Sequence, residues 1–392
     1  MPQRHPTLRG ALLFLTCSLS VLFSLSPHAS VHAQPFAPVL TVQPGNAFVE
    51  GKALYITSGG TVAGLISEET FMVDLSVSWN ATSPAYKLLP LGPTSNWFPS
   101  AMSPDGLKWF VLAAGVGHVF DTQTNQWSQV LNYPDGKSFG HAAATDPISG
   151  KTLIPFGYKN PDGTWSTLIV DLKDNSFASD NRNFTAPDQN TYAATWNTLL
   201  KNLLVVTDGA MHTYNLVEGW KNFTAPQGIQ ASNAYCMASS ASGSKVVLFG
   251  GYSKSLNATV GDIFVLDVPT LTWKKGPSTP PGDVRRSPAC AISNDYFVSW
   301  GGDTGNTATI VPPKNVMLVY DLKTDTWTSN YVAPAPTTPP VITNPPVQPS
   351  NTQAIVPTTT STTSAASKEN TPAWARNMKT VAGIVCILLA IQ

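Results

Sequence analysis

One pair of residues recurs along the chain at a nearly constant interval, and this repeat constrains the fold more than any other feature. In its full form an apolar run ends in Asp and a Trp follows six positions later. The full pairs are Asp121 and Trp127, Asp267 and Trp273, and Asp321 and Trp327; the variants are Asp171 with Phe177, Asp74 with Trp79, and Asn215 with Trp220. The six Asp or Asn positions are about 49 residues apart on average, a period typical of repeat architectures.

Each repeat also contains two earlier apolar runs. The longer of these ends in small residues, as in Lys245–Phe249 before Gly250-Gly251 and Tyr296–Trp300 before Gly301-Gly302. A shorter run precedes it, as in Pro288–Ile292. Short apolar runs that are rich in β-branched and aromatic residues and bounded by Gly, Asn or Asp predict strands.

Four short strands within 50 residues predict one blade of a β-propeller. A single blade leaves both faces of its sheet apolar, and stacking blades around an axis buries them. We therefore predict an all-β, six-bladed propeller with four antiparallel strands per blade over residues 34–332, with residues 35–42 as a candidate closing strand. Five or seven blades, or two β-sandwiches, are the alternatives.

The conserved spacing gives each marker of the repeat a physical role. The Gly pair lets backbone segments approach closely near the axis. The Trp provides an apolar plate between neighbouring sheets, and the Asp accepts N–H bonds from the turn that follows it. This pattern resembles the kelch repeat over residues 35–332, most clearly in the fifth and sixth repeats.

The N-terminal residues 1–33 have the pattern of a secretory signal peptide. Arg4 and Arg9 precede an apolar run, Ala11–Leu25, and small residues before Gln34 mark a cleavage site after Ala33. An uncleaved membrane anchor is the alternative, but the run is shorter than the roughly 20 residues that a span requires.

The C-terminal part has two further segments. Residues 333–380 are rich in Pro, Thr and Ser and predict an extended, O-glycosylated stalk, or else a plain disordered tail. Residues 381–392 form a short hydrophobic tail that follows a polar spacer, which is the pattern of a GPI signal with attachment near Ser364. A transmembrane anchor competes with this interpretation. The chain is thus expected at the cell surface or outside the cell.

Export has consequences for Asn and Cys side chains. The sequons at Asn80, Asn183, Asn222 and Asn257 predict N-glycosylation. Cys236 and Cys290 occupy the same place in the fifth and sixth repeats. They predict either a disulfide, which an oxidising compartment permits, or buried free thiols.

The charge composition excludes one class of partner. Lys+Arg and Asp+Glu number 23 each and charged residues make up only 12% of the chain, so a basic face for nucleic acid is not expected. The partners expected instead are a protein or polysaccharide at the cell surface and the membrane through the C-terminal anchor. We expect a monomer.

Kelch proteins include copper oxidases similar to galactose oxidase and glyoxal oxidase, which the resemblance brings into question here. Copper(II) needs at least two convergent His ligands. The mature chain offers only His118, His141 and His212, in different repeats and without the adjacent Tyr-His pair of those enzymes. We therefore predict a non-enzymatic binding protein with no cofactor, metal or catalytic residue. A copper enzyme, a paired-carboxylate hydrolase and a structural coat protein are the alternatives.

Three aromatic residues are candidates for lining the central channel. His141 lies in an innermost strand, and Tyr192 and Tyr235 lie at matching positions. A ring of such side chains would suit a sugar or another small polar ligand, and hydrogen bonding between blades is the alternative. The basic pair Arg285-Arg286 is expected in a solvated loop rather than at an anion site.

Overall fold

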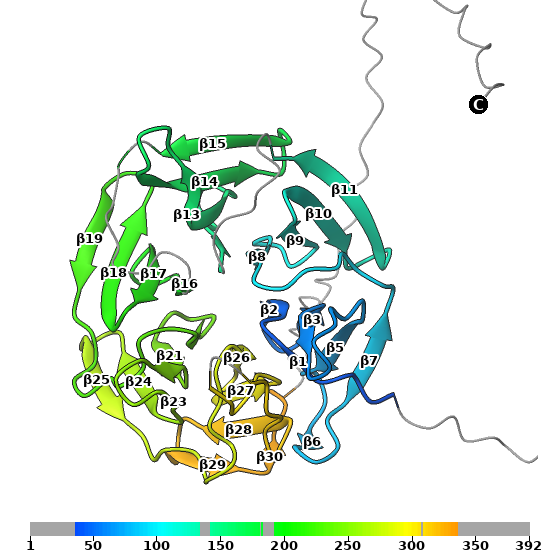
Figure 1. Ribbon diagram of the computed structural model, residues 1–392, viewed down its shortest axis with the longest axis vertical. Coiled ribbons are helices and arrows are strands. Elements are labelled where there is room, and N and C mark those ends of the chain that lie inside the picture. The colour runs from blue at the N-terminus through cyan, green and yellow to red at the C-terminus, as the bar shows by residue number, and fades with distance from the viewer. Residues whose placement is uncertain (1–35, 134–141, 181, 183–191, 307–308, 336–392) are drawn as a thin grey trace, which may run out of the picture. The chain divides into compact units, whose positions relative to one another are not determined.

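Six four-stranded antiparallel sheets stand around a central axis in the computed structural model (Figure 1). Residues 36–133, 142–180, 182, 192–306 and 309–335 are described. Two compact units divide the chain, Met1–Pro336 and Thr337–Gln392, and all described residues belong to the first. Among them no helix is long and apolar enough to cross a membrane.

Each sheet is one blade whose strands follow chain order from the axis to the rim. Blade I contains β2 (Gly45–Val49), β3 (Ala53–Thr57), β5 (Thr70–Asp74) and β7 (Tyr86–Leu89). Blade II contains β8 (Ser100–Met102), β9 (Lys108–Ala113), β10 (Val116–Asp121) and β11 (Gln126–Asn132). Blade III contains β12 (Ala144–Thr145), β13 (Thr152–Lys159), β14 (Trp165–Asp171) and β15 (Ser176–Asp180).

The second half of the disc repeats this order. Blade IV contains β16 (Ala193–Asn197), β17 (Asn202–Thr207), β18 (Ala210–Asn215) and β19 (Gly219–Phe223). Blade V contains β20 (Cys236–Ser239), β21 (Lys245–Phe249), β24 (Ile263–Asp267) and β25 (Thr272–Lys275). Blade VI contains β26 (Ala289–Ser293), β27 (Tyr296–Trp300), β28 (Met317–Asp321) and β29 (Thr326–Thr328). The predicted six-bladed fold is confirmed.

The Asp and Trp markers act as the repeat predicted. Asp121 Oδ1 accepts the N–H groups of Gln123 and Thr124, both at 2.9 Å, and Asp321 does the same in blade VI. Trp327 packs on Phe249 of the neighbouring blade V with ring centroids 5.4 Å apart. The indole N–H of Trp327 also donates to the carbonyl of Pro277 at 2.8 Å, a bond between blades that the repeat did not reveal.

The glycine doublets lie where each blade meets the linker that leads into the next. Gly251 donates its N–H to the carbonyl of Arg285 at 3.0 Å. A Cβ on Gly250 would lie 2.2 Å from that same carbonyl oxygen, and Gly250 has a φ of 66°. The doublet therefore permits a close approach, as predicted, but to the linker between blades V and VI rather than to backbone at the axis.

The prediction that residues 35–42 add a strand to the last blade is wrong. Their strand β1 (Thr41–Val42) pairs with β4 (Gly60–Thr61), in the segment between β3 and β5. Blade VI completes its own four strands, so this segment takes the place that a linker has elsewhere. Gly302 of blade VI accordingly donates its N–H to the carbonyl of Thr41 at 3.0 Å.

A short pair of strands completes the junction between blades VI and I. β30 (Asn330–Tyr331) pairs antiparallel with β6 (Trp79–Asn80). The ring of Tyr331 stacks on Trp79 with centroids 4.8 Å apart, and its hydroxyl donates to the carbonyl of Leu75 at 2.8 Å. The first and last blades are thus joined by main-chain bonds and by a buried aromatic pair.

The expectation that Arg285-Arg286 lies in a solvated loop is also wrong. The Arg285 side chain is 0% exposed and donates to the carbonyls of Gly301, Val316 and Asn315 at 3.2, 3.1 and 2.6 Å. Burial lowers its pKa to about 10. These carbonyls follow β27 and precede β28 without a ladder partner, and buried carbonyls need donors, which explains the buried guanidinium.

Candidate functional site

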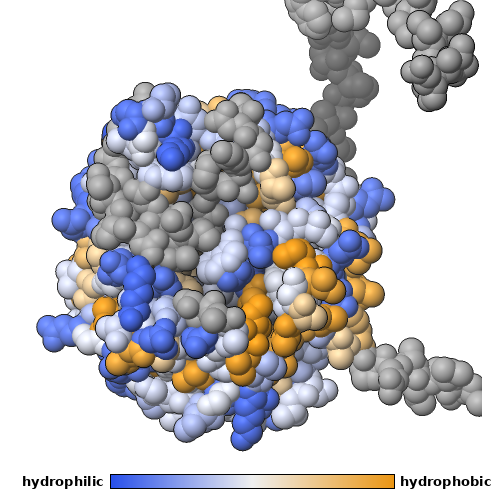
Figure 2. Space-filling model, in the orientation of Figure 1, coloured by the Kyte–Doolittle hydropathy of each residue, from blue (hydrophilic) through white to orange (hydrophobic). Residues whose placement is uncertain are grey.

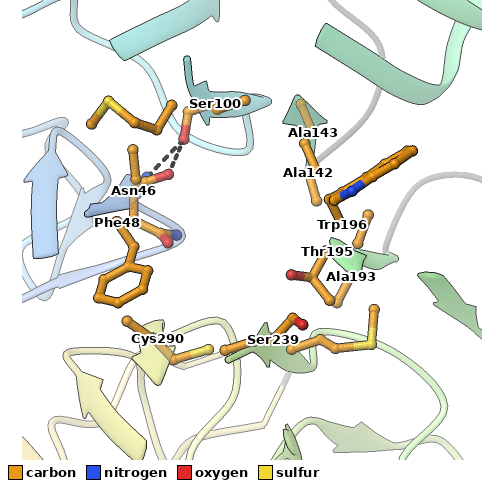
Figure 3. A pocket seen from close by; sticks show the side chains of 18 of the residues that line it. Asn46, Phe48, Ser100, Ala142, Ala143, Ala193, Thr195, Trp196, Ser239 and Cys290 are labelled. Carbon is orange, nitrogen blue, oxygen red and sulfur yellow. Dashed lines mark hydrogen bonds between the residues drawn. The ribbon is translucent and has the colours of Figure 1, made fainter. Parts of the chain in front are cut away.

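A cavity of about 650 Å³ lies within the ring of innermost strands. Its walls come from the first strands of the blades and the segments just before them, and Figure 3 shows this space from close by. Because neighbouring strands of a blade are antiparallel, the cavity has two different ends. We call the end formed by the segments between second and third strands the long-loop face, and the end formed by the tight turns the short-turn face.

The cavity wall is uncharged along most of its length. Among the described lining residues the charged side chains are Glu50, Lys52 and Asp105, which lie in or beside turns of the short-turn face. The remaining described lining consists of small, hydroxyl, amide, thioether and aromatic residues. Charge is therefore confined to one mouth of the cavity.

Two uncharged polar side chains and a phenyl ring point into the same space. Figure 3 shows Asn46 and Phe48 on the wall of blade I and Thr195 on the opposite wall, from blade IV. Among the described residues no hydrogen bond joins the Asn46 amide or the Thr195 hydroxyl to another group. Ser100, by contrast, donates to the carbonyl of Asn46 and accepts from its N–H, so its hydroxyl is fully used between blades I and II.

The structure places the predicted channel residues at the cavity but turns their polar ends away. The hydroxyl of Tyr192 donates to the carbonyls of Ala142 and Pro155 at 3.1 and 2.5 Å. The hydroxyl of Tyr235 donates to the carbonyl of Ala231, and burial raises its pKa. Both tyrosines follow the bland alternative of bonding within and between blades. His141 lies outside the described residues.

The structure joins Cys236 and Cys290 by a disulfide, with Cα atoms 6.2 Å apart. The two residues lie in β20 and β26, the innermost strands of blades V and VI, and both contribute to the cavity wall. The bridge thus ties two adjacent blades together beside the axis.

The long-loop face carries most of the extended connections in the described chain. They join the second and third strands of blades I, V and VI and span residues 58–69, 250–262 and 301–316. In blade I the connection ends in a tight apolar tip, Val62–Ile66, held by bonds from Thr61 N to Leu65 O at 2.7 Å and from Gly64 N to Thr61 O at 2.9 Å. The tip is therefore a fixed projection.

Exposed apolar side chains gather around this tip. Leu65 is 69% exposed and Leu91 is 62% exposed, and Figure 2 shows hydrophobic residues concentrated over blade I on the face in view. We define the blade I patch as the five exposed residues Val39, Val62, Leu65, Ile66 and Leu91. A contiguous apolar patch on a surface commonly marks an interaction site.

The chain leaves the propeller from the opposite end. Pro334 lies close to the turn between β2 and β3, because a Cβ on Gly51 would be 3.3 Å from its side chain. The N–H of Ala333 donates to the Ser78 hydroxyl at 3.0 Å, in the connection that follows β5. Both contacts belong to the short-turn face, so the blade I patch and the exit of the chain lie at opposite ends of the disc.

The described sequons differ in their accessibility. Asn222, on the outer strand of blade IV, and Asn257, between β22 (Tyr252–Ser253) and β23 (Ala258–Thr259), are exposed. Asn80 is partly buried and its amide donates to Asn330 at 3.0 Å in the junction of blades VI and I. Glycosylation of these residues stays a prediction, and Asn183 lies outside the described residues, as does Ser364.

The histidines of the described chain lie in separate blades. His118 is in β10 and His212 is in β18, where its Nδ1 lies 3.2 Å from Asn222 Oδ1. Burial lowers the pKa of both imidazoles. Within the described ranges no three His, Cys, Asp or Glu side chains converge in a group that could hold a metal ion.

Sequence reasoning did not single out Asn46, Phe48, Thr195 or the blade I patch. Asn46 and Thr195 are ordinary strand residues in the repeat, and only the ring arrangement brings blades I and IV to face each other. The patch had one available signal, the apolar run Val62-Ala63-Gly64-Leu65-Ile66 within a long insertion between two strands.

Comparison with known proteins agrees with this architecture. A family model described as the Kelch motif matches residues 233–280, which include all of blade V. No curated protein matches the chain significantly. Among solved structures the chain is similar to one described as the structure of YjhT, with 14% identity, a TM-score of 0.52, and coverage of 75% of this chain and 98% of that chain. Identity this low supports the fold alone. The motif match and the six four-stranded blades together identify the chain as a kelch-repeat β-propeller.

Proposed function

We propose that this propeller is a non-enzymatic recognition protein of the cell surface that binds a protein or glycan partner through its long-loop face. The observation that carries the proposal is the position of the blade I patch, opposite the end where the chain leaves for its C-terminal segment. A chain held at the membrane by that segment would present the patch away from its attachment. Loops on a rigid scaffold are common binding elements.

Binding to cell-surface material tests the proposal. Labelled full-length protein, released from its anchor, is added to intact cells and to isolated surface protein and glycan fractions. The double substitution Leu65→Ser and Leu91→Ser should lower the apparent affinity at least tenfold. The matched control is Leu199→Ser with Val217→Ser, which removes similarly exposed apolar side chains, 52% and 89% exposed, from the short-turn face. Absence of saturable binding, or equal loss in both double variants, would end the proposal.

Two further measurements address the enzyme and anchor alternatives. Stoichiometric copper in the purified protein, together with peroxide release from alcohol or aldehyde substrates, would replace the binding function with an oxidase. Mass spectrometry of the mature C-terminus tests the anchor: a lipid-ethanolamine remnant near Ser364 is the expected result, and an intact terminus at Gln392 would contradict GPI attachment.

A further inference from the structure

We propose that the axial cavity binds a neutral saccharide, with Phe48 as the surface for the sugar ring and Asn46 and Thr195 as its polar contacts. The inference rests on the proposed function for the glycan nature of the partner, but it concerns a different place in the molecule. Substitutions in the cavity and in the blade I patch therefore test the two separately.

The charge distribution of the cavity excludes an ionic ligand from its middle. The charged side chains of the described lining are at the short-turn mouth, where Glu50 accepts the N–H of Asn294 at 2.7 Å and Asp105 accepts that of Leu107 at 3.0 Å. An ion placed between the walls of blades I and IV would lose water without gaining a counter-charge, which is costly. A ligand for this space must be uncharged.

The polar groups of the middle of the cavity match hydroxyl groups. The Asn46 amide offers donors and an acceptor, and the Thr195 hydroxyl offers one donor and two acceptor sites. They face the cavity from opposite walls (Figure 3), and no hydrogen bond within the described residues occupies them. A ligand with hydroxyl groups on both sides can satisfy both, whereas a purely hydrocarbon ligand would take water from them without return.

The apolar part of the wall matches the C–H face of a sugar ring. Phe48 presents its ring to the cavity, and Met102 and Met237 add flexible thioether side chains to the lining. Met side chains adapt to irregular surfaces. The cavity volume of about 650 Å³ is in the range of about 300–1,000 Å³ that small-molecule sites have. Uncharged polar groups, an aromatic surface and this volume together fit a saccharide unit.

Titration with simple sugars tests the inference. The probes are the methyl glycosides of glucose, galactose, mannose and N-acetylglucosamine, with glucuronate and glucosamine as charged counterparts. Saturation-transfer NMR and calorimetry on the full-length protein should show saturable binding of at least one neutral glycoside. The charged counterparts should bind at least tenfold more weakly. Binding of none of the glycosides, or equal binding of the charged sugars, would overturn the proposal.

Substitutions place the bound sugar. Thr195→Val, Asn46→Leu and Phe48→Leu keep approximate side-chain size and should each lower the affinity at least fivefold while thermal unfolding stays close to that of the parent protein. Thr326→Val and Phe177→Leu make the same changes on the outer strands β29 and β15 and should leave sugar binding unchanged. Folded cavity variants with parental affinity would refute the cavity as the site. Leu65→Ser with Leu91→Ser should retain sugar binding, so loss of long-loop binding alone leaves this inference standing.

Discussion

At the scale of the residue, the glycine doublets show how one missing Cβ permits a junction between blades. Gly250 and Gly150 both have positive φ, 66° and 73°, but only Gly250 lies against a neighbouring backbone oxygen. We expect Gly150→Ala to cost about 1–2 kcal/mol of unfolding free energy from backbone conformation alone. Gly250→Ala adds a 2.2 Å contact with the Arg285 carbonyl and should cost several kcal/mol more or prevent folding. Urea denaturation of both variants measures the difference, and equal losses would show that the linker moves aside freely.

Buried imidazoles give a second prediction at the residue scale. Burial lowers the pKa of His118 and His212 in the folded protein, and the hydrogen bond from His212 to Asn222 opposes this only in part. The unfolded chain therefore takes up protons first as the pH falls through about 6.5, the ordinary pKa of His, so the free energy of unfolding should fall from pH 8 to pH 5. Urea denaturation across this range should show a smaller decrease in the double variant His118→Gln with His212→Gln. An unchanged pH dependence would mean that other groups cause it.

At the scale of the element, the disulfide connects the innermost strands of two blades. Cys236 and Cys290 are separated by 54 residues, so the bridge closes a long loop in the unfolded chain. Loop-closure entropy predicts that the double variant Cys236→Ser with Cys290→Ser loses about 4 kcal/mol of unfolding free energy. Urea denaturation compares it with the parent protein, and reduction of the parent with dithiothreitol should reproduce the loss. Insensitivity of the parent to reductant would contradict a bonded pair in the mature protein.

At the scale of the whole molecule, the ring depends on the contact between its first and last blades. Tyr331 provides both an aromatic surface against Trp79 and a hydroxyl that bonds Leu75 and, at 2.8 Å, Ser293. Tyr331→Ala should cost about 3–5 kcal/mol because it removes a fully buried aromatic side chain. Tyr331→Phe keeps the stacking and should cost about 1–2 kcal/mol. Thermal and urea unfolding separate the two, and similar small losses in both would place the closure of the ring elsewhere.

The repeat in the sequence determined the number of blades, the strands of each blade and the roles of its Asp and Trp, because these depend on contacts within one repeat or between neighbouring repeats. The fate of residues 36–42, the burial of Arg285 and the cavity residues Asn46 and Thr195 depend on segments far apart in the chain. Only a closed ring brings Thr41 to blade VI and sets blade I opposite blade IV. Local patterns specify each sheet, whereas the curvature of the whole ring decides which side chains share its centre.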